Sequence, residues 1–212
     1  MPEERHRPGL FEPQVIRGIA ARLRVQWLLQ NFDERKVWAA FMFVNGFITI
    51  GLLSLVALAT GTPFVFPSLG PTAFLFFFDP KAPSASPHHA VIGHAIGIVC
   101  GYGSLLLLHL EHSGSALALG VDGRRVLAAA LSLAATGALM ILLKAAHPPA
   151  GATTLIISLG AIARPAHLVV IEVALVLLVL QAIAINRLAG LDYPLWLPRA
   201  PRQTGAERKG PL

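Results

Sequence analysis

The chain has 212 residues, of which 55% are hydrophobic and only 13% are charged. A soluble domain carries about 25% charged residues, so this composition excludes an ordinary soluble enzyme or binding domain. The net charge of +6 could suggest nucleic acid, but the basic residues gather in the two tails, so we exclude nucleic acid as a partner. One cysteine cannot form a disulfide or a cysteine-based metal framework.

Residues 1–36 form a basic segment that precedes the first apolar run. Apolar residues recur at helical spacing from Pro13 to Gln30, which predicts an amphipathic helix. This helix would lie on the membrane surface or pack on the protein's own cytoplasmic face. Basic residues flank the first and the last apolar run, and the positive-inside rule then puts both termini in the cytoplasm. We expect a bacterial inner membrane.

Four stretches contain no Asp, Glu, Lys or Arg: 37–78, 90–110, 126–143 and 173–186. A helix needs about 20 apolar residues to cross the hydrocarbon layer. We therefore predict an all-α, polytopic membrane helical bundle over residues 37–190, with full spans at about 37–60, 90–110, 125–146 and 167–188. Residues 191–212 should form an interfacial and disordered tail, with Tyr193 and Trp196 at the membrane surface.

Two further apolar segments, 62–78 and 147–163, are short for a crossing and hold Pro and Gly near their starts. Proline interrupts a helix because it has no N–H and clashes with the preceding turn. We therefore predict two broken, half-helical segments.

The two broken segments resemble each other. "PSLGPTAFL" (67–75) and "PPAGATTLI" (148–156) share P-x-x-G-x-T, and the segments that follow place His94 opposite Glu172. The order of a full span, a broken segment and a full span thus occurs twice, which predicts an internal duplication with halves at about 37–110 and 125–188. If the short segments cross, each half has three spans and the halves are inverted; if they re-enter, there are four spans and parallel halves. Arg124 and Arg125 favour a cytoplasmic middle loop and four spans, whereas Lys81 and Lys144 favour the other arrangement.

Helices that start inside a membrane make an anion site. Their first N–H groups lack intrahelical partners, and the helix dipole adds about half a positive charge. The candidate binding residues, from the two breaks and the cationic groups beside the second, are Ser68, Gly70, Thr72, Lys144, His147, Gly151, Thr153 and Thr154. Lys144 and His147 share a face if helical geometry holds between them. Alternatively, the lysine snorkels, the histidine caps a helix and the hydroxyls bond within helices.

Titratable groups inside a membrane are candidates for proton relay. His94 and Glu172 are the two such candidates here, and each could instead make an interhelical hydrogen bond. The run His88, His89 and His94 offers a metal cluster, but few carboxylates lie near it, so we predict no metal and no cofactor. Glycines at four-residue spacing from Gly93 predict close helix packing.

The order "PSLGPTA", "P…GH" at Pro87, Gly93 and His94, and "AHPPAGATTL" resembles the HPP family of integral membrane proteins. The resemblance covers about residues 36–190. Cyanobacterial and chloroplast members are implicated in nitrite transport, which implies a small inorganic anion as the substrate, with nitrite first. The alternatives are a pathway for a cation or neutral solute at Glu172, and a membrane-embedded enzyme with His147 as base. The sequence disfavours the enzyme because no nucleophile accompanies the base. We expect a homodimer in the lipid bilayer.

Overall fold

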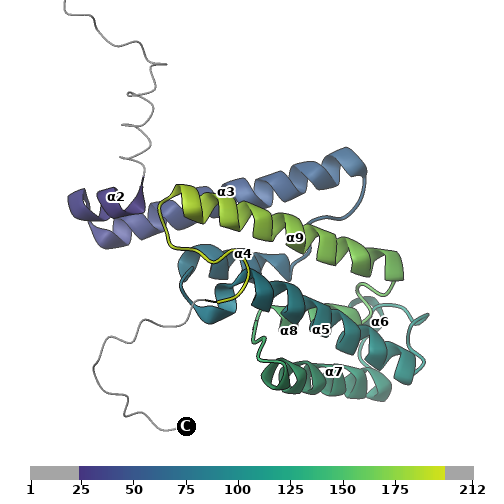
Figure 1. The fold of residues 1–212 in the computed structure, drawn as a ribbon. Coiled ribbons are helices and arrows are strands. Elements are labelled where there is room, and N and C mark those ends of the chain that lie inside the picture. The colour runs from purple at the N-terminus through teal and green to yellow at the C-terminus, as the bar shows by residue number, and fades with distance from the viewer. Residues whose placement is uncertain (1–23, 199–212) are drawn as a thin grey trace, which may run out of the picture.

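The fold was analysed in a computed structural model that describes residues 24–198 (Figure 1). Within this range the regular structure is entirely helical, as predicted. The elements are α2 (Val25–Asn31), α3 (Glu34–Thr60), α4 (Leu69–Phe78), the 3₁₀ turn η1 (Pro83–Ala85), α5 (Pro87–Leu107), α6 (Ala116–Leu119), α7 (Gly123–Leu142), α8 (Ala150–Ser158) and α9 (Pro165–Leu188).

Four helices are long and apolar enough to cross a membrane: α3, α5, α7 and α9. They confirm the four predicted spans. The largest difference is the end of α7, which stops at Leu142 rather than near residue 146. Lys144 adopts a left-handed backbone with φ 52°, which cannot continue a right-handed helix.

The two short helices lie where the Pro/Gly breaks predicted them. Ser68 is the N-cap of α4 and Pro149 is the N-cap of α8. Proline is tolerated there because the first N–H groups of a helix have no partner within it.

The bundle has two ends. The proximal end holds α2, the start of α3 and the end of α9, where the Val25 N–H donates to the Ala189 carbonyl over 2.9 Å. The distal end holds the end of α5, α6 and the start of α7. There the Ala116 N–H donates to the carbonyl of Leu159, just after α8, over 2.9 Å.

Helix α8 runs beside α5 in the same direction, toward the distal end. Ala150 lies against Gly97 and Ile157 lies against Gly101. Helix α4 begins inside the bundle and ends toward the proximal end, where Phe77 meets Phe41 of α3 edge-on, with ring centroids 6.3 Å apart. Both short segments thus continue the path from one end to the other.

Each half therefore passes between the ends three times, and the halves run in opposite directions. The contacts repeat under exchange of the halves. Each short helix packs on the long helix before it and on the last helix of the other half, α4 on α3 and α9, and α8 on α7 and α5. Of the two arrangements left open by the sequence, these helix directions favour the inverted one. Of the two arginines that favoured four spans, Arg125 is buried, 3% exposed, and serves packing, whereas Arg124 is exposed.

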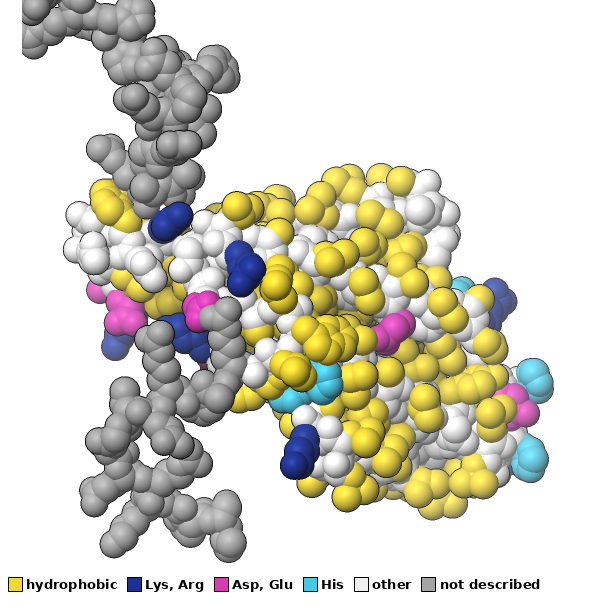
Figure 2. Space-filling view, viewed as in Figure 1, with side chains coloured by type: hydrophobic (Ala, Val, Ile, Leu, Met, Phe, Trp, Pro, Cys, Tyr) yellow, Lys and Arg dark blue, Asp and Glu magenta, His cyan; other side chains and the backbone are white. Residues whose placement is uncertain are grey.

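The outer surface is apolar, as a lipid-facing surface requires. Figure 2 shows hydrophobic side chains over the long helices, with many Lys and Arg near α2 and the start of α3. One prediction for the tail fails: Tyr193 is 1% exposed and packs in the core, whereas Trp196 is 46% exposed. Of the predicted helix over Pro13–Gln30, only the part within α2 lies in the described range, as residues 1–23 and 199–212 fall outside it.

Candidate functional site

Two threonines from the two short helices meet at one histidine. The Nε2 atom of His94 lies 2.9 Å from Oγ1 of Thr72, and its Nδ1 atom lies 2.8 Å from Oγ1 of Thr153. Thr72 is the fourth residue of α4 and Thr153 the fourth of α8, so they occupy equivalent positions in the duplication. Two segments far apart in the sequence thus hold one imidazole from both sides.

His147 extends this cluster toward the proximal end. Its Nε2 atom lies 3.1 Å from Oγ1 of Thr72, and its Nδ1 atom lies 2.8 Å from the Ser84 carbonyl oxygen. Thr72, His94, His147 and Thr153 are each 0% exposed. The cluster is therefore a dry polar chain inside an apolar bundle.

The hydrogen positions in this chain can be assigned by counting donors. The Ser84 carbonyl only accepts, so Nδ1 of His147 carries the proton and its Nε2 accepts in the neutral ring. The Thr72 hydroxyl then donates its one hydrogen to His147 at 3.1 Å in preference to the Ser68 carbonyl at 3.4 Å, and it accepts from Nε2–H of His94. Nδ1 of His94 is left to accept from the Thr153 hydroxyl. Every hydroxyl and ring N–H of the neutral cluster is thus used inside it.

The amide groups at the start of α8 are not free, contrary to the prediction. The N–H groups of Ala150, Gly151 and Ala152 donate to the carbonyls of residues 147, 148 and 149 over 3.0, 3.0 and 3.1 Å. Two successive prolines hold the backbone in a tight turn, and the i→i−3 bonds of that turn satisfy the first donors. On the α8 side, donors for a ligand must therefore come from hydroxyls and imidazoles, while the helix dipole still contributes positive potential.

The other predicted binding residues lie around the cluster in different ways. Ser68 is 1% exposed, and its hydroxyl has no hydrogen-bond partner among the described residues. Thr154 packs α8 on its neighbours, with its Oγ1 2.9 Å from Oγ1 of Thr136. Gly70 is exposed, and a side chain there would meet open space. A Cβ on Gly151 would meet Leu133 of α7 at 3.4 Å.

Lys144 does not join His147 on one face. The helix ends before it, its backbone is left-handed and its side chain is exposed. The helix does not continue from Lys144 to His147, so the two side chains do not share a face. The part of Lys144 that approaches the histidines is its carbonyl oxygen, which lies 2.8 Å from Nε2 of His89.

Glu172 is separate from the hydrogen-bonded cluster. It lies seven positions after the proline that starts α9, as His94 does in α5 (165 to 172, 87 to 94), but the two helices run in opposite directions. Both its carboxylate oxygens are buried and have no hydrogen-bond partner in the described part of the chain. These oxygens are open to a proton or a cation.

The predicted glycine face of α5 brings α8 close to His94. A methyl group on Gly97 would come within 2.8 Å of the Ala150 carbonyl oxygen, and one on Gly93 within 2.6 Å of Cβ of His147. Small residues let the two backbones approach, and this approach puts Thr153 within reach of His94.

Sequence reasoning missed two parts of the support. The Ser84 carbonyl, which orients His147, is a backbone atom and leaves no signal in the side-chain pattern. Arg125 binds the carbonyls of Ser158, Ser113 and Gly114 over 3.1, 3.2 and 2.7 Å, and so fixes the end of α8. The position of Arg125 directly before an apolar run was the available signal, but we interpreted it as evidence for a cytoplasmic loop.

Comparison with known proteins places the chain in a family. A family model described as "HPP, transmembrane region" matches residues 32–194. A protein of Dictyostelium discoideum described as a transmembrane protein is 31% identical over 125 residues, which cover 58% of this chain and 37% of that relative. The matched region is therefore well under half the length of that relative. No solved structure matches.

Proposed function

Because the chain belongs to the HPP family of integral membrane proteins, we propose that it transports a small inorganic anion together with a proton, with nitrite as the first substrate to test. One observation carries the proposal. The two inverted half-helices present equivalent threonines, Thr72 and Thr153, to the same buried imidazole of His94. Sites of this kind, between repeats and at half-helix N-termini, are the usual substrate sites of secondary transporters.

The hydrogen-bond count links the anion to the proton. In the neutral cluster every hydroxyl and ring N–H is already used. A proton on Nδ1 of His94 would turn the Thr153 hydroxyl from a donor into an acceptor, and its own hydrogen would then be free to bind an anion. The imidazolium would balance a single negative charge in a dry interior, where an isolated charge is costly. By linkage, each of the two ligands then favours binding of the other.

Other predicted residues have supporting places in this scheme. The unpartnered hydroxyl of Ser68 offers a further donor near the start of α4. His147 orders the chain through Thr72, and the dipoles of α4 and α8 add positive potential. Gly151 and Thr154 contribute to the packing around the cluster, and Gly70 and Lys144 contribute through the backbone alone.

The orientation follows from the proximal basic residues. That end carries Arg24, Arg35, Lys36, Lys144 and Arg187, and such an excess marks the cytoplasmic side. We accordingly place both termini in the cytoplasm of a bacterial cell and expect a homodimer.

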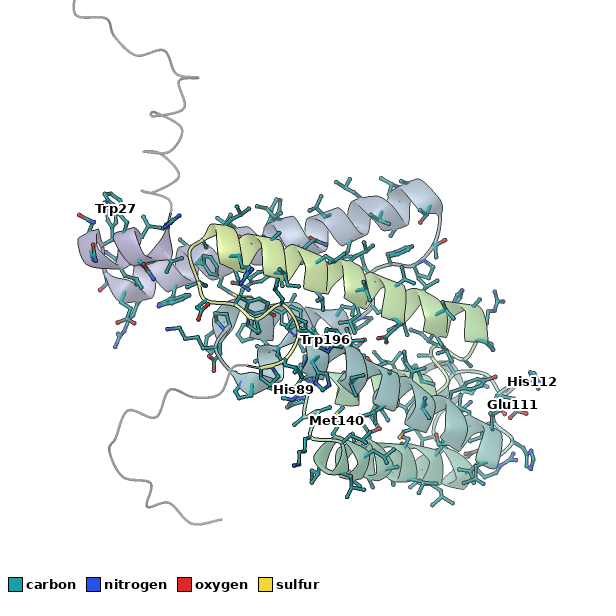
Figure 3. The ribbon with its side chains drawn as sticks, viewed as in Figure 1. Trp27, His89, Glu111, His112, Met140 and Trp196 are labelled. Carbon is teal, nitrogen blue, oxygen red and sulfur yellow. The ribbon has the colours of Figure 1, made fainter. Side chains whose placement is uncertain are left out.

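A test uses purified protein in liposomes with nitrite outside and an inward proton gradient. We expect the gradient to accelerate nitrite uptake, and His94→Gln to abolish the acceleration. His112→Gln is the matched control, because His112 lies on the distal loop, exposed (Figure 3). If nitrite uptake is independent of the gradient in the unmodified protein and in His94→Gln, transport is not coupled to protons. If neither nitrite nor other small anions are taken up, the substrate is not a small inorganic anion.

A second function has its own observation. The two unpartnered oxygens of Glu172 favour a pathway in which a cation, rather than an anion, is carried. Uptake of a labelled monovalent cation that Glu172→Gln abolishes and His94→Gln leaves intact would favour this second function.

A further inference from the structure

The 3₁₀ turn η1 is bound by side chains through three successive carbonyls. Pro83 O lies 2.6 Å from Nδ1 of His89, and Ser84 O lies 2.8 Å from Nδ1 of His147. The third carbonyl, of Ala85, accepts from the hydroxyl of Tyr193. The turn thus joins α5, the His-Pro-Pro segment and the C-terminal segment after α9, at the proximal end of the cluster.

His89 makes contacts that its neutral form cannot satisfy. Its second nitrogen, Nε2, lies 2.8 Å from the Lys144 carbonyl oxygen. A neutral imidazole has one N–H, whereas both nitrogens donate in the doubly protonated ring. Two carbonyls facing the two nitrogens are therefore both hydrogen-bonded only when the ring is charged.

The two carbonyls belong to opposite halves of the duplication. Pro83 lies in the connection from α4 to α5, and Lys144 lies in the connection from α7 to α8, where its φ of 52° turns the carbonyl toward His89. The ring is 8% exposed, so water does not readily replace either bond. Figure 3 labels His89 near the start of α5 and Trp196 on the C-terminal segment, which contacts the neighbouring His88.

We propose that His89 is a positioning residue and a gate for the turn η1: doubly protonated, it ties the turn to the Lys144 carbonyl and holds the Ser84 carbonyl on His147. When His89 loses a proton, one nitrogen lone pair faces a carbonyl oxygen, and the turn is released from one half. The Ser84 carbonyl, which orders the protons of the cluster, moves with the turn. This gate needs no particular substrate and does not depend on the proposed transport function.

Other groups around His89 take part in different ways. His88, on the same helix, has its ring centroid 5.5 Å from that of His89 and packs edge-on against Trp196. His147, from the His-Pro-Pro segment, binds the next carbonyl of the turn, so a charge on its ring would oppose the charge on His89. Burial raises the pKa of Tyr193, so its hydroxyl keeps its proton and holds Ala85 in both states. The Lys144 side chain is exposed.

The first experiment reads the protonation directly. The full-length protein, labelled with ¹⁵N-histidine in nanodiscs, is compared with His89→Asn to assign the signals. At about pH 5.5, we expect both ring nitrogens of His89 to carry hydrogen, because each of them faces a carbonyl oxygen. A His89 signal with one unprotonated nitrogen at about pH 5.5 would overturn the proposal.

The second experiment measures the opening of the turn without any substrate. Ala85 is 0% exposed, so a thiol there reacts with a maleimide only when the turn opens. Ala85→Cys is made in Cys100→Ala, which removes the chain's one cysteine. Rates are divided by those of Leu117→Cys in the same background, a position 80% exposed, to remove the thiol's own pH dependence.

The normalised rate should rise about tenfold between about pH 5.5 and about pH 8, as expected for loss of one hydrogen bond to a charged group. His89→Gln, which cannot reach both carbonyls, should react rapidly at both values. His89→Arg, which keeps donors and a permanent charge, should react slowly at both. Equal rates at the two pH values in protein with His89 intact would overturn the gate, whatever the outcome of the nitrite assay.

Discussion

The two short helices place the same residue type, a threonine, on His94 but differ in their packing. α4 and α8 each begin at a proline-rich break and place a threonine on His94. α8 lies between α5 and α7, on the glycine face, and its C-terminal carbonyl is held by the guanidinium of Arg125. α4 keeps an exposed stripe that includes Phe74 and Phe78, 49% and 66% exposed.

The feature that α4 and α8 share is therefore the hydrogen bond from a threonine to His94, whereas the packing around the two helices differs. Both short helices pack on two long helices, but every residue of α8 is buried or half-buried, and its end is also held by Arg125. α4 has a lipid-facing side and a single amide at its end, where Nδ2 of Asn186 donates to the Phe76 carbonyl over 3.1 Å. If one half-helix moves to admit a ligand, we expect it to be α4.

The largest expected effect compares the two threonines. Thr72→Val removes the partner of both His94 and His147, whereas Thr153→Val removes one partner of His94. Each buried group left unpaired costs about 1–3 kcal/mol, so Thr72→Val should destabilise the protein by roughly 2–6 kcal/mol and Thr153→Val by about half as much. Thermal unfolding in detergent measures both, with Thr→Ser at each position as the control that keeps the hydroxyl. Equal losses of stability would contradict this prediction and would mean that Thr72 and Thr153 contribute equally to the stability of the protein.

The second prediction concerns the ends of the short helices. Arg125→Gln should cost about 2–4 kcal/mol, because three carbonyls lose a charged donor inside the bundle. Asn186→Ala, at the end of α4, breaks one neutral hydrogen bond and should cost only about 1 kcal/mol. Melting temperatures of the two variants test the order. A smaller loss at Arg125 than at Asn186 would contradict the view that α8 is the more firmly fixed helix.

The third prediction tests the glycine face of α5. A methyl group at Gly97 would lie 2.8 Å from the Ala150 carbonyl, so Gly97→Ala should force α8 away and cost about 1–3 kcal/mol. On the same helix, a side chain at Gly103 meets nothing within 4 Å, so Gly103→Ala is the matched control and should be neutral or slightly stabilising. Unchanged nitrite uptake by a stable Gly97→Ala protein would show that close approach of α8 is not needed for the site.

The smallest effect is expected at Lys144. Lys144 has a φ of 52°, which costs a residue other than glycine about 1 kcal/mol because its Cβ is crowded. Lys144→Gly should therefore raise the melting temperature slightly. Because the side chain is exposed, we expect Lys144→Ala to leave anion affinity unchanged. A clear weakening of nitrite affinity in Lys144→Ala would instead restore the lysine to the binding site.

Much of the fold could be predicted because it depends on local features. The uncharged runs marked α3, α5, α7 and α9, and the prolines marked the starts of α4 and α8. The candidate site was predicted in part. Thr72, Thr153, His94 and His147 meet as a cluster, although His94 was predicted to couple protons and not to bind both threonines. The condition for a shared face of Lys144 and His147, helical geometry between them, fails because Lys144 adopts a left-handed backbone, and no pattern in side-chain type signals that change.

The sequence by itself determined that this chain enters a membrane, how many long helices it has and where two of its segments break. Hydrophobicity, charge and proline act on neighbouring residues, so they can be read along the chain. Only the tertiary structure decided that the Ser84 carbonyl orients His147 and that His89 faces carbonyls from the connections before α5 and before α8. These two contacts of His147 and His89 join residues 63 and 55 positions apart, and only the packing of α5 against α8 brings such residues together.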